Sequence, residues 1–313
     1  MIFRDISAGF AHCALTIRRG VVGIVLTAVV NLVFVPNAAA QQSFIRDAEV
    51  EATIRGWTAP LLRAAGIPPN DVRIHLVQSD ELNAFVAGGL HIFIYIGLLQ
   101  RSESPEQVIG VIAHEIGHIQ GGHLARFRDE LDGATAQSIL FTVLGIAAAV
   151  ASGDARVGVA VGAFGQTAAL KNLLQYSRTQ ESAADQAALR LLDATEQSAQ
   201  GLGSFLSVLG DQELLLPEHQ DPYLRTHPIS QERIQALQEH LTHSRFTGVK
   251  ANAAAYEAHA RMKAKLDGFL KPIGRVLYDY PESDASTPAL IARAVAYHRD
   301  NRPEEADKLL ATL

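Results

Sequence analysis

The sequence predicts an α+β protein that is mainly helical, with one small antiparallel sheet and a helical hairpin at its carboxyl terminus. Short runs that alternate between apolar and polar residues lie between residues 72 and 95, as expected of strands. Apolar residues recur at helical spacing over most of the remaining chain, and the last thirty or so residues have the spacing of a tetratricopeptide helix pair. With 313 residues, 48% of them hydrophobic, the chain can form one substantial domain and a smaller appendage.

The first forty residues have the features of a secretory signal peptide. Arg18 and Arg19 precede an apolar run at 21–35, and small residues follow at 38–40. The run is about 15 residues long, which is short for a helix that spans a bilayer. We therefore predict a signal peptide at 1–40 and export of the remaining chain to a bacterial periplasm. The alternative is an uncleaved amino-terminal anchor.

The composition argues against a nucleic-acid partner and against disulfides. The formal net charge is -6, so a broad basic surface is not expected. Cys13 is the only cysteine, and it lies inside the predicted signal peptide. The exported protein would therefore have no disulfide and no cysteine metal ligand.

A helix and three strands are the first predicted elements of the exported chain. The helix covers about residues 41–65 and ends at Gly66 and the prolines that follow it. The strands are expected at 72–77, 83–86 and 91–95, and we interpret them as the small antiparallel sheet.

The next helix begins near Ser104. Serine at the cap, Pro105 in the first turn and Gln107 three residues after the cap are typical of a helix start. Gly121 and Gly122 weaken the helix at its far end.

Residues 138–170 are rich in alanine, valine and leucine, but Gly153 and Asp154 interrupt the run before it reaches the length of a membrane span. We predict two buried or surface-lying helices here. The alternative is a hairpin that dips into the membrane and gives the protein a peripheral membrane contact. Helical spacing continues over 171–210 and 229–270.

The carboxyl-terminal hairpin is predicted to turn at 299–302. A single tetratricopeptide repeat cannot bury its own faces, so this one would either pack on the helix around residues 256–269 or begin an array. An ordinary helical hairpin is the alternative. The positions that carry the repeat spacing are Leu290, Ala294, Tyr297 and Ala306.

The helix that follows Ser104 contains an HExxH motif. His114 and His118 are four residues apart, so their imidazoles project from one face of a helix and can bind one zinc ion. Glu115 lies next to the first ligand, where it can accept a proton from a water molecule that zinc has acidified. The motif therefore predicts a zinc hydrolase with one Zn²⁺ per chain and Glu115 as the general base.

A catalytic zinc site needs a third protein ligand. If the third ligand were a histidine of an extended HExxH motif, it would lie six residues after His118. That residue is Leu124, and His123 lies one position too early. We leave His123 as a structural residue. The best candidate is Glu181, which a second helix would present to the metal.

Asp185 shares a helix face with Glu181 and is expected to support the site. Its carboxylate could accept a hydrogen bond from the far nitrogen of a ligating histidine. Ala183 and Ala184 would let this helix approach the first one closely. Arg178 lies one turn before Glu181 and is expected to pair with one of the two carboxylates, or to be a plain surface residue.

These residues resemble the HtpX, Oma and CAAX-prenyl-protease group of gluzincin metallopeptidases, in which glutamate from an ExxxD helix completes the HExxH site. The resemblance extends over about residues 45–270. It includes Asn83–Phe85 with the strand that follows, Thr226–Pro228, and Glu232–Ile234. The group implies a zincin-like core, which we place at 41–270, with 271–313 as a tetratricopeptide-like segment that is incomplete if the array continues.

Within that group, the signal peptide and the repeat-like tail are most similar to the periplasmic BepA type. The resemblance implies a zinc endopeptidase that acts on unfolded or misassembled outer-membrane proteins, in contact with their assembly machinery and with a chaperone-like role. It also implies that His227 lies near the metal, where it would stabilise the oxyanion or occupy the open metal position. The alternative function is a latent metallochaperone or scaffold that works mainly through its tail.

Overall fold

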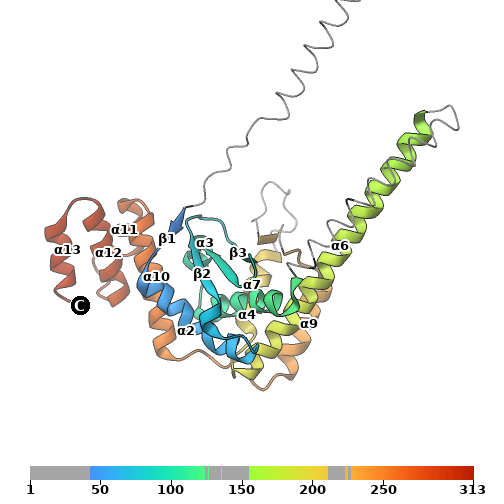
Figure 1. Ribbon diagram of the computed structural model, residues 1–313. Coiled ribbons are helices and arrows are strands. Elements are labelled where there is room, and N and C mark those ends of the chain that lie inside the picture. The colour runs from blue at the N-terminus through green and yellow to red at the C-terminus, as the bar shows by residue number, and fades with distance from the viewer. Residues whose placement is uncertain (1–42, 124–125, 127–134, 136–154, 211–222, 225–226) are drawn as a thin grey trace, which may run out of the picture. The chain divides into compact units, whose positions relative to one another are not determined.

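Helices make up most of the described chain, and four short strands form its one described sheet (Figure 1). The structure, a computed structural model, describes residues 43–123, 126, 135, 155–210, 223–224 and 227–313. The predicted signal peptide therefore lies outside the described residues. The strands are β1 Phe44–Ile45, β2 Arg73–Val77, β3 Ala84–Ala87 and β4 His91–Tyr95. The helices are α2 Ala48–Ala64, α3 Ile96–Arg101, α4 Pro105–Gly121, α6 Ala155–Ala194, α7 Gln200–Gly210, α9 Gln231–His243, α10 Ala253–Leu270, α11 Ile273–Asp279, α12 Thr287–Arg299 and α13 Pro303–Leu310, with a 3-10 turn η1 at Pro69–Asp71.

The sheet is mixed, so the prediction of an antiparallel sheet was wrong. Its strand order is β1-β2-β4-β3, and β2 and β4 are parallel. Gly88 and Gly89, both at positive φ, close a tight hairpin that makes β3 and β4 antiparallel. Because β3 lies on the outer side of this hairpin, β4 returns beside β2 in the same direction.

The first helix begins later than predicted. Phe44 and Ile45 pair with β2 as an extra strand. The carboxylate of Asp47 then accepts hydrogen bonds from the backbone N–H groups of Glu49 and Val50, 3.0 Å each, and so caps α2 at Ala48. A capping side chain satisfies N–H groups that the first helical turn leaves free, which explains why the helix starts here.

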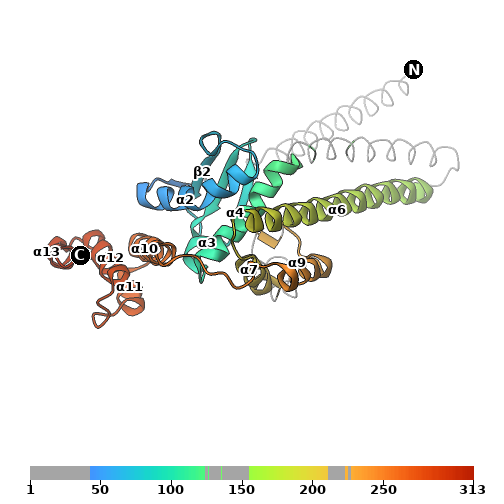
Figure 2. The same ribbon diagram turned by 90° about the horizontal axis from the view of Figure 1, so that it is seen from below.

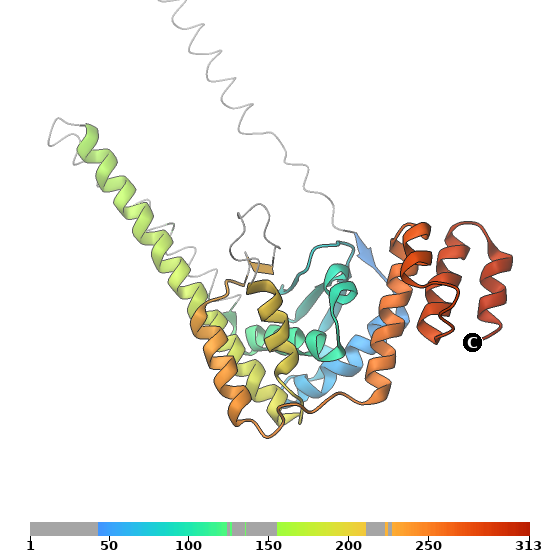
Figure 3. The same cartoon turned by 180° about the vertical axis from the view of Figure 1, so that it is seen from behind.

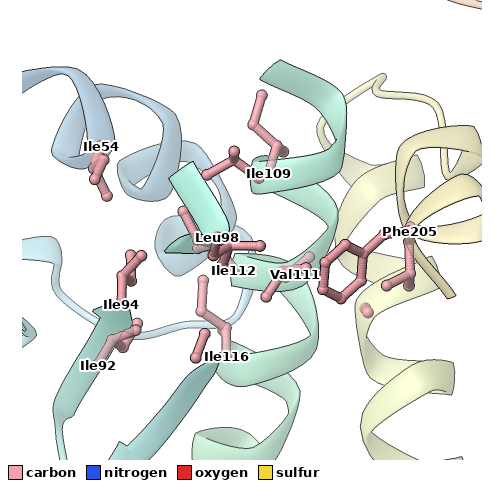
Figure 4. Packing of buried hydrophobic residues seen from close by; sticks show 14 of the residues in the cluster. Ile54, Ile92, Ile94, Leu98, Ile109, Val111, Ile112, Ile116 and Phe205 are labelled. Atoms are coloured by element: carbon pink, nitrogen blue, oxygen red, sulfur yellow. The ribbon is translucent and has the colours of Figure 1, made fainter. Parts of the chain in front are cut away.

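The core lies between the sheet and the helices α2 and α4. Ile92 and Ile94 of β4 point from the sheet toward Ile112 and Ile116 of α4, and Ile54 of α2 lies beside them (Figure 4). All five side chains are almost fully buried. Burial of this size fixes α4, the helix with the HExxH motif, against the sheet.

One long helix, α6, covers the described part of the alanine-rich region and much of the helical stretch predicted after it. It runs for 40 residues from Ala155 to Ala194 and extends past the neighbouring described elements (Figures 1 and 2). It ends at a turn where Glu196 has a φ of 57°. The first half of the predicted membrane-dipping hairpin, at 138–154, lies outside the described residues. Among the helices that the structure describes, none is long and apolar enough to cross a membrane.

The carboxyl-terminal helices α12 and α13 form a hairpin, and α12 packs on α10, which is one of the two arrangements considered from the sequence (Figure 3). Ala264 of α10 joins Ala292 and Ala296 of α12 in a small second cluster of buried side chains. On the same helix, Met262 and Leu266 belong to the main core. The helix α10 therefore connects the tail to the core. The identity of this hairpin as a tetratricopeptide repeat remains a prediction.

Candidate metal centre

The helix α4 carries two histidines and a glutamate into the interior. His114 and Glu115 are fully buried, and His118 is partly exposed. The Nε2 atoms of His114 and His118 are 3.1 Å apart, because residues four positions apart lie on the same helix face. The helix ends directly after the motif, at Gly121, with Gly122 in the left-handed region at a φ of 61°.

The helix α6 brings Glu181 to the two histidines. A Cβ atom at Gly117 would lie 2.6 Å from the carbonyl oxygen of Ala184, so the two helices meet at a distance that only glycine permits. At this crossing, Glu181 Oε2 is 3.2 Å from His114 Nε2, and Oε1 is 3.2 Å from His118 Nε2. Of the two alanines expected at this contact, Ala184 is buried in it and Ala183 is exposed.

His227 joins the same cluster from the segment before α9. Its Nδ1 is 3.2 Å from both oxygens of Glu181 and 3.4 Å from His114 Nε2. Its Nε2 lies 3.3 Å from the carbonyl oxygen of Ala84 in β3. The ring of Tyr223 stacks on the imidazole of His227, with 4.4 Å between the ring centres. These contacts hold the imidazole with Nδ1 toward the other ligand atoms.

The donor set fits one zinc ion. One atom from each of His114, His118, Glu181 and His227 lies within 4.8 Å of the other three. Ligand atoms at zinc–ligand distances of about 2.0–2.2 Å in a tetrahedron are about 3.3 Å apart, and the distances between donors here are 3.1–3.4 Å. Three neutral nitrogens and one carboxylate oxygen are also the ligand types that zinc accepts.

The charges of the cluster are strongly coupled. Burial alone would lower the pKa of His114, but its contacts with Asp185 and Glu181 raise that pKa to about 10. Burial and the neighbouring His114 lower the pKa of His118 to about 3, against the opposing effect of Glu181. Burial would raise the pKa of Glu181, but His227, His114 and His118 hold it well below its usual range. Without a metal, Glu181 is therefore ionised, His114 is protonated and His118 is neutral.

Asp185 and Arg233 support the ligands from behind. Asp185 Oδ1 is 2.9 Å from His114 Nδ1, the nitrogen that faces away from the cluster. Arg233 donates to both oxygens of Asp185, at 2.6 and 2.9 Å, and its Nη1 is 3.1 Å from Glu181 Oε2. Arg178, which we expected either to pair with one of these carboxylates or to be a plain surface residue, is exposed. Arg233 is the arginine that pairs with both carboxylates.

His123, which we expected to be a structural residue, contacts the candidate ligand His118. Its Nδ1 is 2.9 Å from His118 Nδ1. Gly121 makes room for this ring, because a Cβ atom there would lie 2.2 Å from His123 Nε2. Gln180 donates a hydrogen bond to the carbonyl oxygen of His123, which connects the end of α4 to α6.

Glu115 lies beside the donor set without belonging to it. Among the described residues, neither carboxylate oxygen has a hydrogen-bond partner, and the nearest ion-pair contact is 3.6 Å, from Oε1 to His227 Nε2. Burial raises the pKa of Glu115 above its usual value. A buried carboxylate with free oxygens and a raised pKa has the properties of a general base that operates near neutral pH.

Three residues of the centre were not assigned a role from the sequence. Arg233 lies in the Glu232–Ile234 element that resembles the peptidase group, but its sequence position gives no sign of a partner 48 residues earlier. Tyr223 and His123 are detectable only from their contacts with His227 and His118. The Arg233 contact is long-range, whereas the other two join residues four and five positions apart.

Curated proteins that are similar to this chain include bacterial proteases. The chain is 26% identical over 186 residues to the beta-barrel assembly-enhancing protease of Escherichia coli K12. The aligned segment covers 59% of this chain and 38% of that protein. It is 27% identical over 164 residues to that of Yersinia pestis, with coverages of 51% and 32%. A Vibrio cholerae protein described as a protease of the same kind is 26% identical over 261 residues, with coverages of 74% and 53%. The chain therefore spans about half the length of these relatives, or less.

The model of Peptidase family M48 matches residues 20–241. This range contains the HExxH helix, Glu181, His227 and Arg233. Since the match covers well over half of the chain and includes every residue of the metal centre, the chain belongs to peptidase family M48.

Proposed function

We propose that the chain is a zinc-dependent endopeptidase of the periplasm, with one zinc ion per chain. The observation that carries the proposal is the convergence of His114 Nε2, His118 Nε2 and the Glu181 carboxylate, at 3.1–3.2 Å from one another, beside the buried carboxylate of Glu115. These three residues would hold the metal. Bound zinc supplies Lewis acidity, which lowers the pKa of water and polarises a peptide carbonyl.

Protein side chains would carry out the proton transfer, orient the ligands and stabilise the oxyanion. Glu115 takes the proton of the attacking water and returns it to the leaving amine. Asp185 fixes the orientation of His114 through the nitrogen that faces away from the metal. His227 would stabilise the oxyanion. The substrate would bind in an extended conformation along the free edge of β3, where main-chain hydrogen bonds give affinity.

The proposed substrates are unfolded or misassembled outer-membrane proteins. The support is the activity for which the Escherichia coli relative is named, that of a beta-barrel assembly-enhancing protease. The proposal includes a signal peptide at 1–40, a peptidase domain at 41–270 and a tetratricopeptide-like segment at 271–313 that contributes a chaperone-like role or contacts an assembly machinery. Release of the processed protein from cells by osmotic shock would support this location, whereas retention until detergent is added would contradict it.

Substitution of Glu115 by glutamine tests the enzymatic proposal. The Glu115→Gln protein should bind zinc as the wild type does and fail to cleave an unfolded protein such as casein, because glutamine keeps the shape of the side chain but cannot accept the proton. Glu181→Ala should lose zinc as well as cleavage. Undiminished cleavage by Glu115→Gln, or stoichiometric zinc in Glu181→Ala, would refute the assignment.

A second candidate function is a latent metallochaperone or scaffold. It is favoured by one observation: His227 Nδ1 lies within 3.2 Å of Glu181 and 3.4 Å of His114 Nε2, close enough to be a fourth ligand where a catalytic site keeps a position for water. If the site is latent in this way, His227→Ala should cleave casein faster than the wild type. If His227 only stabilises the oxyanion, the same variant should cleave casein more slowly than the wild type.

A further inference from the structure

A row of stacked aromatic side chains crosses the face of the sheet that points away from α4. Phe44, His75, Phe93 and Phe85 come from β1, β2, β4 and β3, in their spatial order. Phe93 stacks on His75 at 4.7 Å and on Phe85 at 4.9 Å between ring centres, and Phe44 contacts both His75 and Phe93. The row arises from the register, which sets Phe93 directly opposite His75 and Phe85.

The row is only partly covered. Phe44 is 53% exposed, and Phe85, Phe93 and His75 are each partly buried. The helices α2 and α4, which contact β2 and β3, pack on the opposite face of the sheet, where Ile92 and Ile94 lie. The row ends at Phe85 on β3, and β3 pairs only with β4 among the described strands.

The backbone of β3 shows which groups are free to bind another strand. Tyr95 N–H donates to the carbonyl oxygen of Asn83, so Asn83, Phe85 and Ala87 direct their backbone groups toward β4. The groups of Ala84 and Val86 then point to the open edge, in agreement with the contact between Ala84 O and His227 Nε2. A strand added here would bond to Val86, and to Ala84 once His227 is displaced from its carbonyl oxygen, and would place one of its residues directly opposite Phe85.

We propose that Phe85, backed by Phe93, forms a subsite for an aromatic side chain of the substrate, on the face of the sheet opposite to the metal. This inference rests on the proposed function, since it requires a substrate strand on β3. The substrate class is an extended segment with aromatic residues at every second position. Its alternate side chains would continue the aromatic row, and those in between would face the metal side.

The geometry favours a close aromatic contact. Because Phe85 directs its own backbone groups to β4, an antiparallel substrate residue opposite it belongs to a non-hydrogen-bonded pair, in which side chains are closest. Phe93 already holds the ring of Phe85 from the other side. The new side chain therefore meets a fixed ring, and little conformational freedom is lost on binding.

Peptide binding tests the subsite separately from catalysis. Three fluorescently labelled peptides of equal length and equal end charges are used: one alternates Phe and Thr, one alternates Ala and Thr, and one has the composition of the first with its Phe residues adjacent. Their dissociation constants are measured by anisotropy with the zinc-loaded Glu115→Gln protein. The alternating Phe peptide should bind about tenfold more tightly than each of the other two.

Three substitutions in the same background identify the residue responsible. Phe85→Thr should remove the preference, and Phe85→Trp should keep it because the aromatic ring remains. Phe44→Ala is the matched control at the far end of the row, outside the subsite, and should leave the preference unchanged. Circular dichroism checks that each variant is folded.

The outcomes distinguish this inference from the proposed function. Equal binding of the three peptides, or an unchanged preference in folded Phe85→Thr, would overturn the subsite. A preference that Phe44→Ala removes as Phe85→Thr does would also overturn it. If the preference is found but neither the wild type nor His227→Ala cleaves the bound peptide, the endopeptidase proposal fails while the subsite stands.

Discussion

Arg233 stands between the two carboxylates of α6 and the segment that carries His227. Besides its bonds to Asp185 and Glu181, it donates a 2.6 Å hydrogen bond to the carbonyl oxygen of Pro228, next to His227. It is 2% exposed. One side chain thus fixes Glu181, the Asp185 carboxylate that contacts His114, and the backbone next to His227.

Replacement of Arg233 by lysine should weaken zinc binding by about 10- to 100-fold, since lysine cannot bind both oxygens of Asp185 and the Pro228 carbonyl at once. The control is Arg178→Ala, which removes an exposed arginine of α6, one turn from Glu181. This substitution should leave the affinity unchanged. Competition with a coloured chelator measures both. A normal affinity in Arg233→Lys, or a loss in Arg178→Ala, would reverse our assignment of the supporting arginine.

Zinc binding should release about one proton per site at neutral pH. In the metal-free protein His114, with a pKa raised to about 10, is protonated, His118 is neutral and Glu181 is ionised. The metal must displace the proton of His114, so its apparent affinity should rise about tenfold per pH unit between about pH 6 and pH 9. Titration calorimetry in two buffers of different ionisation enthalpy counts the proton. A pH-independent affinity would contradict this charge distribution.

The residues of the site differed in how far the sequence revealed them. His114, Glu115 and His118 follow from spacing along one helix, because local geometry fixes which side chains share a face. Glu181 required the chemical argument that zinc needs another ligand. His227 came from a family resemblance. Arg233 was not assigned at all, since nothing local indicates which carboxylate a distant arginine will meet.

Among the helices, the contact between α4 and α6 determines whether the ligands from the two helices meet. Gly117→Ala should destabilise the protein by about 1–3 kcal/mol and weaken zinc binding, because the added methyl group meets the Ala184 carbonyl and pushes the helices apart. Urea unfolding and chelator competition measure the two effects.

Gly56→Ala is the matched control for Gly117→Ala. Gly56 lies in α2, is exposed and has no atom within 4 Å of an added Cβ. This substitution should stabilise the protein by about 0.5–1 kcal/mol and leave zinc binding unchanged, because alanine favours the helix. Equal effects of the two substitutions would show that helix propensity, and not the contact, sets the result.

The elements themselves were predictable where their signals are local. The hairpin glycines and the alternating runs gave three strands, and the glycines after His118 gave the end of α4. Strand direction was missed, since it depends on which side of β4 the hairpin places β3. The strand at Phe44 was missed because it also depends on a non-local contact. Its two residues form a strand only by pairing with the edge of β2.

At the level of the whole described chain, α10 determines whether the tail and the core unfold together. Asp267, which is buried on α10, accepts hydrogen bonds from Gln100 of α3 and from Tyr280 after α11, at 2.7 and 2.9 Å. The main core and the second cluster also take side chains from this one helix. Residues 43–313 form one compact unit by their contacts. The arrangement predicts one cooperative transition.

Trp57, the one tryptophan of the chain, can test this cooperativity because it lies on α2, packed against the main core, with its ring centre 6.4 Å from that of His259 on α10. Ala296→Leu overfills the second cluster, where Ala296 is 1% exposed, and should cost about 1–3 kcal/mol. If the two clusters unfold together, the urea midpoint of Trp57 fluorescence should fall by the same amount as the midpoint of far-ultraviolet circular dichroism. Ala254→Leu, the same change at an exposed position of α10, should move neither midpoint. A separate early transition in circular dichroism, with the Trp57 midpoint unchanged, would show that the tail unfolds independently and that α10 does not couple it to the metal centre.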